Sequence, residues 1–110
     1  TKELSFGVEI SVSPDNDLDR VERITKEVIR ETLKESDGAA KDFEPFIRYF
    51  ALGDNRINLR AVLRVTEYSY KFPVRHEFIK RLHQRYKQEG IKMALPLQTV
   101  FIGKEGTDEG

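Results

Sequence analysis

The stretch FIRYFALGDNRINLRAVLRV, residues 46–65, decides the fold. Its two halves are rich in β-branched and aromatic residues, and they flank the short sequence Gly-Asp-Asn-Arg at 53–56. This pattern is typical of a β-hairpin. In the second half, apolar residues from Ile57 to Val65 alternate with mostly polar ones, which predicts a strand with one buried face. Helical patterns lie on both sides of this hairpin in the sequence, so the simplest compact arrangement packs both helices on its apolar face.

A strand and a helix are predicted before the hairpin. Residues 4–12 alternate between apolar and small or polar side chains without a break, which predicts a strand. Asp15, Asp17 and Asp19 follow it, where carboxylates cap a helix and face its positive end. Apolar residues then recur at helical spacing from Leu18 onward, and Gly38 predicts the stop of this amphipathic helix.

A second helix is predicted after the hairpin. Pro73 suits the first helical position, and a glycine at 90 predicts a sharp end at which Ile91 lies against Tyr86. The apolar stripe of this helix recurs every four residues and is widened by one neighbour; it consists of Val74, Phe78, Leu82 and Tyr86 with Ile79.

Residues 97–102 form a further strand candidate behind Pro96, and the glycine-rich, charged residues 103–110 are expected to be disordered. The element order is therefore β-α-β-β-α followed by a final β. This order predicts the α+β class, as a ferredoxin-like sandwich with two helices on one face of a mainly antiparallel sheet. We expect residues 1–96 to form the domain proper.

Composition limits what the chain does. Its 19 basic and 19 acidic residues balance, and it has no cysteine, so neither strong nucleic-acid attraction nor a disulfide framework is expected. No apolar run approaches the roughly 20 residues that cross a bilayer. Because the chain starts at Thr1 and enters a strand almost at once, we expect it to be a fragment of a longer protein.

No catalytic constellation stands out, so no enzyme activity, cofactor or metal is predicted. His76 and His83 are seven residues apart, too far along a helix to share an ion, and are expected to be solvated. Segment 15–37 holds five basic and eight acidic residues, whereas segment 71–92 holds seven basic and two acidic ones. These opposed charges suit either nucleic acid at one end or neighbouring copies that meet acidic to basic, although plain solvated faces explain most of them.

The strand at 46–52 carries more apolar groups than one face can bury. Either Ile47, Tyr49 and Ala51 or Phe46, Phe50 and Leu52 face the helices, and the other set lies on the open face of the sheet. A cluster of this kind indicates a partner surface, unless loop or tail residues cover it.

The ending GIKMALPLQTVFI, residues 90–102, resembles the end of the small-conductance mechanosensitive channel family. There, too, a helix stops at Gly-Ile, a proline-containing turn follows, and a short strand closes the protein. The Asp-rich turn before Leu18, the hairpin sequence ALGDNRINL at 51–59, and QEGI at 88–91 fall in the family's order. The resemblance covers residues 4–102. Where the family usually has Pro-aromatic-Pro-Gln, this chain has Ala-Leu-Pro-Leu at 94–97.

The resemblance implies the cytoplasmic C-terminal domain of a channel subunit on the inner side of the cell membrane, whose transmembrane helices precede Thr1. It implies a homo-oligomer, a heptamer, whose copies form a solute-filtering cage and whose last strands gather in a small axial barrel. Such channels open under membrane tension and release solutes during hypoosmotic shock.

The expected subunit contacts combine the hairpin with the last strand. Either Leu97, Thr99 and Phe101 or Gln98, Val100 and Ile102 line the barrel contact; the interface set is Phe46, Phe50, Leu52, Leu97, Thr99, Val100 and Phe101. The isolated chain is expected to associate weakly or not at all, since one short strand per copy buries little area. The alternative function is a free-standing ferredoxin-like module that binds a small ligand or RNA.

Overall fold

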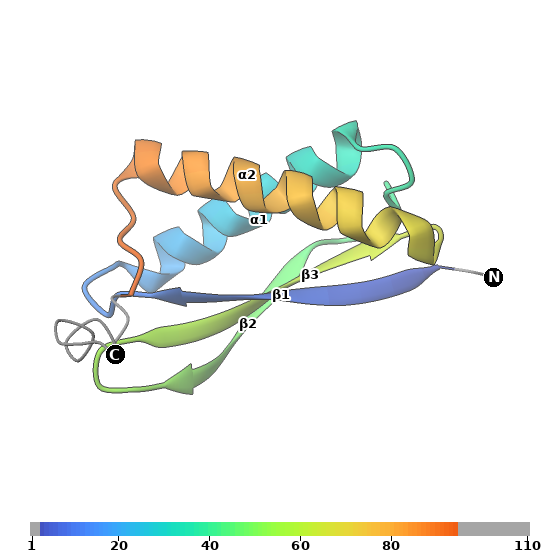
Figure 1. The fold of residues 1–110 in the computed structure, drawn as a ribbon. Coiled ribbons are helices and arrows are strands. Elements are labelled where there is room, and N and C mark those ends of the chain that lie inside the picture. The colour runs from blue at the N-terminus through green and yellow to red at the C-terminus, as the bar shows by residue number, and fades with distance from the viewer. Residues whose placement is uncertain (1–2, 95–110) are drawn as a thin grey trace, which may run out of the picture.

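The computed structural model describes residues 3–94 as a three-stranded antiparallel sheet covered by two helices. In chain order these are β1 (Leu4–Val12), α1 (Leu18–Glu35), β2 (Phe46–Leu52), β3 (Ile57–Val65), the short 3-10 helix η1 (Tyr68–Tyr70) and α2 (Lys71–Glu89). The strand order is β1-β3-β2, and both helices lie on the same face of the sheet (Figure 1). The predicted α+β, ferredoxin-like arrangement is confirmed, while the predicted strand at 97–102 and tail at 103–110 lie outside the described residues.

The hairpin is the centre of the sheet. β3 pairs with β1 along its whole length, from Leu4 opposite Val65 to Val12 opposite Ile57, and with β2 on its other side. Leu59, Ala61, Leu63 and Val65 are fully buried under the helices, as the alternation predicted. The buried face of β3, the middle strand, therefore forms the sheet side of the hydrophobic core.

Local signals fixed both ends of α1 to within a few residues. The Asp17 carboxylate accepts hydrogen bonds from the amides of Asp19 and Arg20, so Asp17 is the N-cap. The helix ends at Glu35, earlier than the predicted glycine stop. Gly38 instead lies in the following turn with a φ of +76°. Its carbonyl accepts from the Thr66 amide at 2.7 Å, which ties this turn to the end of β3.

α2 begins two residues before the predicted Pro73, directly after η1. A proline in the first helical turn costs nothing, because the first amides of a helix have no intrahelical partner. The helix ends as predicted: Gly90 has a φ of +74°, and the Ile91 amide donates to the Tyr86 carbonyl at 2.9 Å. Of the predicted stripe, Ile79 is the exception, since it is 46% exposed.

The core holds a buried hydrogen bond between the helices. The hydroxyls of Thr25 and Tyr86 lie 2.6 Å apart, and burial raises the pKa of Tyr86 to about 12. A second hydroxyl, that of Tyr49, donates to the Leu18 carbonyl at 2.7 Å. These bonds satisfy polar groups that are costly to bury alone, and they fix how α1 sits on α2 and on β2.

Candidate functional site

The open face of the sheet, opposite the helices, is the first surface that the sequence pointed to. β2 turns Ile47 into the core and leaves Tyr49 half-buried, as in the first of the two predicted sets, whereas Ala51 of that set is exposed. Phe46 is half-buried, Phe50 is 49% exposed and Leu52 is 81% exposed. The predicted apolar surplus on β2 is therefore present.

A β-bulge at Phe50 corrects the simple alternation assumed for β2. Tyr49 pairs with Leu59, but the next pair along β3 is Ala51 with Asn58, and Leu52 then pairs with Ile57. Cross-strand partners point to the same side of a sheet, so Leu52 shares the face of Ile57 and not that of Phe46. Phe46 and Leu52 thus belong to two different surfaces, joined by the edge of β2.

Arginine side chains cover the aromatic rings of the open face. The guanidinium carbon of Arg48 lies 4.9 Å from the ring centre of Phe46, and that of Arg60 lies 5.2 Å from the ring centre of Phe50. Arg64 stacks in the same way on Phe43, at 4.9 Å. Such cation–π contacts shield apolar rings while they keep a charged outer layer. The open face is therefore a mixed aromatic and cationic surface.

Acidic and small groups of β1 hold these arginines in place. Arg60 donates to the Glu9 carboxylate at 2.6 Å, and its side chain crosses the space above Gly7. A Cβ at Gly7 would lie 2.5 Å from the Arg60 Cδ, so the glycine leaves the room that the Arg60 side chain occupies. Arg64 donates to the Ser5 hydroxyl at 2.9 Å.

The opposed charges of the two helices are partly paired within the chain. Arg85 of α2 contacts Glu27 of α1 at 2.5 Å and Glu89 on its own helix at 3.0 Å. Arg81 contacts Glu35 at 2.8 Å, and Arg20 contacts Glu89 at 2.9 Å. Some charges of the acidic helix and of the basic helix therefore meet side by side, and this pairing leaves less free charge than the sequence suggested for a neighbouring copy or for nucleic acid.

These ion pairs alter the titration of their members. Hydrogen bonds from Arg85 lower the pKa of Glu27 and of Glu89, and hydrogen bonds from Glu27 and Glu89 raise the pKa of Arg85. A lowered carboxyl pKa stabilises the fold above the pKa of the unfolded chain, and this contribution is lost as the pH falls through the folded value. The contact between the helices is thus expected to weaken in acid.

The remaining site candidates are placed as follows. His76 and His83 are both exposed on α2, as predicted. Within residues 3–94, no group of three or more His, Cys, Asp or Glu side chains is arranged to hold a metal ion. No helix of this part of the chain has the length and apolar character to cross a bilayer. The predicted contact residues Leu97, Thr99, Val100 and Phe101 lie outside the described residues.

Comparison with known proteins identifies the family of the chain. The family model described as "Mechanosensitive ion channel MscS, C-terminal" matches residues 6–93. The chain belongs to this family. It is a family of ion-channel domains and not a class of enzymes. The match spans all the described strands and helices except the first two residues of β1, so the resemblance seen in the sequence is confirmed.

Solved structures of channels in this family share the fold. Helicobacter pylori MscS in its closed state superposes with a TM-score of 0.66 at 17% identity, covering 86% of this chain and 36% of that one. Arabidopsis thaliana MSL1 superposes with a TM-score of 0.64 at 12% identity, covering 87% of this chain and 35% of that one. No curated protein matches the sequence. The chain spans about a third of the length of these channel structures.

Sequence reasoning missed two features of this MscS-type domain. One is the bulge at Phe50, for which a run of bulky residues at 46–52 gives no local signal. The other is a groove between β1 and α2, to which Ile79 and Met93 contribute exposed apolar side chains. Ile79 widens the apolar stripe of α2, and that extra width is the sign of a second apolar surface.

Proposed function

We propose that this chain is the cytoplasmic domain of a tension-gated channel that releases solutes during hypoosmotic shock. The observation that carries the proposal is the family match over residues 6–93, which includes both helices, β2, β3 and most of β1. The fold shared with MscS and MSL1 supports it. In this role the domain performs no chemistry; it contributes subunit assembly and the wall of a solute-filtering cage on the inner side of the membrane.

The assembly is a homo-oligomer, a heptamer, built around two surfaces of each copy. The first is the mixed aromatic and cationic face of the sheet with the adjoining edge of β2, which together present Phe46, Phe50 and Leu52. The second is the strand at 97–102, whose copies close an axial barrel through Leu97, Thr99, Val100 and Phe101. Closure supports this arrangement physically, because a barrel leaves no strand edge unpaired. Residues 103–110 extend beyond it as a disordered tail.

Removal of the last strand is expected to break this assembly. In the full channel protein, deletion of residues 97–110 removes the barrel while it leaves every residue of the described domain in place. We expect the purified protein in detergent to shift from one oligomeric mass to smaller species, as measured by light scattering on a sizing column. Deletion of residues 103–110 alone is the matched control and should leave the mass unchanged. An unchanged mass after the longer deletion contradicts the assembly role of the strand.

The alternative, a free-standing module for a small ligand or RNA, has one observation in its favour. Arg48, Arg60 and Arg64 lie over aromatic rings on the open sheet face, which is where RNA-binding domains of related topology stack bases. Here the guanidinium groups occupy the ring faces themselves, and Arg60 is already bound to Glu9. We therefore prefer assembly for this surface.

A further inference from the structure

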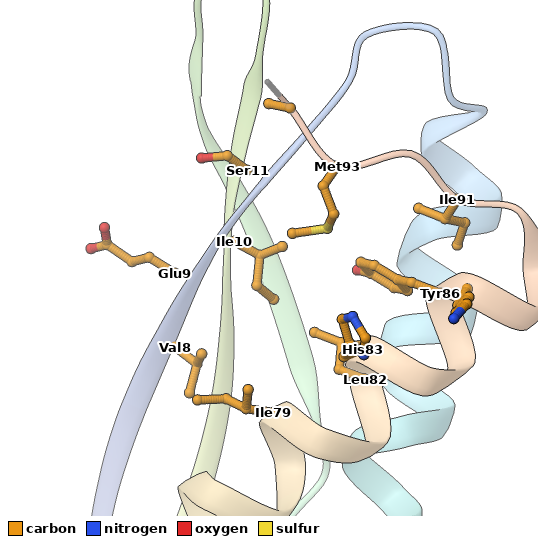
Figure 2. Close-up of a pocket in the computed structure, with 12 residues that line it drawn as sticks. Val8, Glu9, Ile10, Ser11, Ile79, Leu82, His83, Tyr86, Ile91 and Met93 are labelled. Carbon is orange, nitrogen blue, oxygen red and sulfur yellow. The ribbon is translucent and has the colours of Figure 1, made fainter. Parts of the chain in front are cut away.

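A groove of about 560 Å³ runs between β1 and the second half of α2. Val8 and Ile10 line it from the strand, Ile79 and Leu82 from the helix, and Met93 reaches into it from the segment after α2 (Figure 2). Glu9 and Ser11 point to the other side of β1. Ile79 and Met93 remain 46% and 50% exposed, so the described part of the chain leaves apolar groove wall uncovered.

The chain itself enters this groove as the start of a strand. After α2 it turns back beside β1, where the Ser13 amide donates to the Lys92 carbonyl at 3.0 Å and the Ala94 amide donates to the Ser11 carbonyl at 3.1 Å. The Asn16 side chain fixes the same point, since it donates to the Lys92 carbonyl and accepts from the Lys92 amide. Val12 and Met93 thus form an antiparallel pair at the edge of the sheet.

This register dictates what comes next. In an antiparallel pair the partner moves back by one residue for each step forward. If the pairing of Val12 with Met93 continues in the same register, Leu95 comes opposite Ile10 and Pro96 opposite Glu9. Side chains alternate along a strand, which puts Leu95 on the same side as Met93, toward the groove. Pro96 falls at the next position that must donate an amide to β1, as Ala94 does. Proline has no amide hydrogen, so the pairing ends there.

We propose that Leu95 of this same chain occupies the groove, and that Pro96 then releases the following strand from β1. The volume of the groove leaves ample room for a leucine side chain beside Ile10 and Ile79. The first residue past the described domain is thus an anchor, and the strand at 97–102 leaves the domain from a fixed point. This consequence for assembly rests on the proposed function, whereas the occupation of the groove does not.

Methyl NMR on the 110-residue chain tests the proposal directly. With leucine and isoleucine methyls labelled, we expect NOE cross-peaks from Leu95 to Ile10 and Ile79. A mixture of labelled and unlabelled chains, recorded with an isotope filter, should show no such cross-peaks between molecules. Absence of the Leu95 cross-peaks overturns the proposal, and so does their appearance between molecules, which would assign the groove to a second copy.

A pair of variants adds a second readout. Leu95→Asp places a charge in the groove, and we expect the melting temperature to fall by about 4–8 °C, the shift that a loss of about 1 kcal/mol causes in a domain of this size. Gln98→Asp adds the same charge after Pro96, beyond the proposed pairing with β1, and should leave the melting temperature within about 1 °C. Equal shifts in melting temperature for the two variants would contradict the placement of Leu95 in the groove. Neither experiment depends on channel activity. A failure of the proposed groove occupation by Leu95 can therefore be distinguished from a failure of the proposed channel function.

Discussion

Replacing Phe78 by alanine lowers the free energy of unfolding by about 3–5 kcal/mol. Phe78 is the largest fully buried side chain of the domain, and it lies on α2 at 0% exposure within the core that α1 and the sheet enclose. Its removal costs the transfer of the ring and leaves a cavity that packed neighbours fill only in part. Because domains of this size are stable by only about 5–15 kcal/mol, much of the total is lost. Urea titration followed by circular dichroism measures the change.

Phe72 supplies the matched control for this loss. It lies on the same helix, but it is 52% exposed, and its ring packs against the exposed ring of Tyr68, 5.8 Å away between centroids. Phe72→Ala makes the same chemical change and should cost no more than about 1 kcal/mol. If both variants lost the same stability, the described packing of α2 on the sheet would be wrong.

The second large effect is expected at Gly38, where alanine should cost about 2–5 kcal/mol. Two penalties add there: the left-handed backbone at a φ of +76°, and a Cβ only 2.0 Å from the Tyr70 ring. Tyr70 belongs to η1, so the clash would push this short helix away from the turn that follows α1. Thermal unfolding of Gly38→Ala against the parent chain gives the size of the effect.

Gly90 separates the two penalties. It has nearly the same φ, +74°, but no atom lies within 4 Å of the Cβ that alanine would add. Gly90→Ala should therefore cost only the backbone strain, about 1–2 kcal/mol. In addition, Gly38→Ala should be less damaging when Tyr70 is also alanine, compared with Tyr70→Ala alone. Equal costs at Gly38 and Gly90 would show that the turn and η1 do not pack as described.

The parts of the fold that could be predicted are those with local, short-range signals. Strict alternation identified β1 and β3, an aspartate before Leu18 identified the start of α1, and Gly90 identified the end of α2. Each of these signals acts through the backbone conformation or burial of its own neighbourhood. Nothing far away in the sequence was needed to read them.

What could not be predicted depends on contacts between distant segments. The bulge at Phe50 lies in the pairing of β2 with β3, and the pairing of Arg85 with Glu27 requires α1 and α2 to be adjacent. Two of the cation–π contacts likewise join residues that are distant in sequence, namely Arg60 with Phe50 and Arg64 with Phe43. The alternation of apolar and polar residues along one strand predicts none of these contacts.

We propose that this domain belongs to a channel opened by membrane tension. The most direct test is a patch-clamp recording from liposomes that contain the full protein encoded by its gene, with suction applied in steps. We expect currents that appear above a threshold of tension and vanish when the suction is released. A protein that inserts and assembles in the liposomes, yet passes no current up to the tension at which the membrane ruptures, would contradict it.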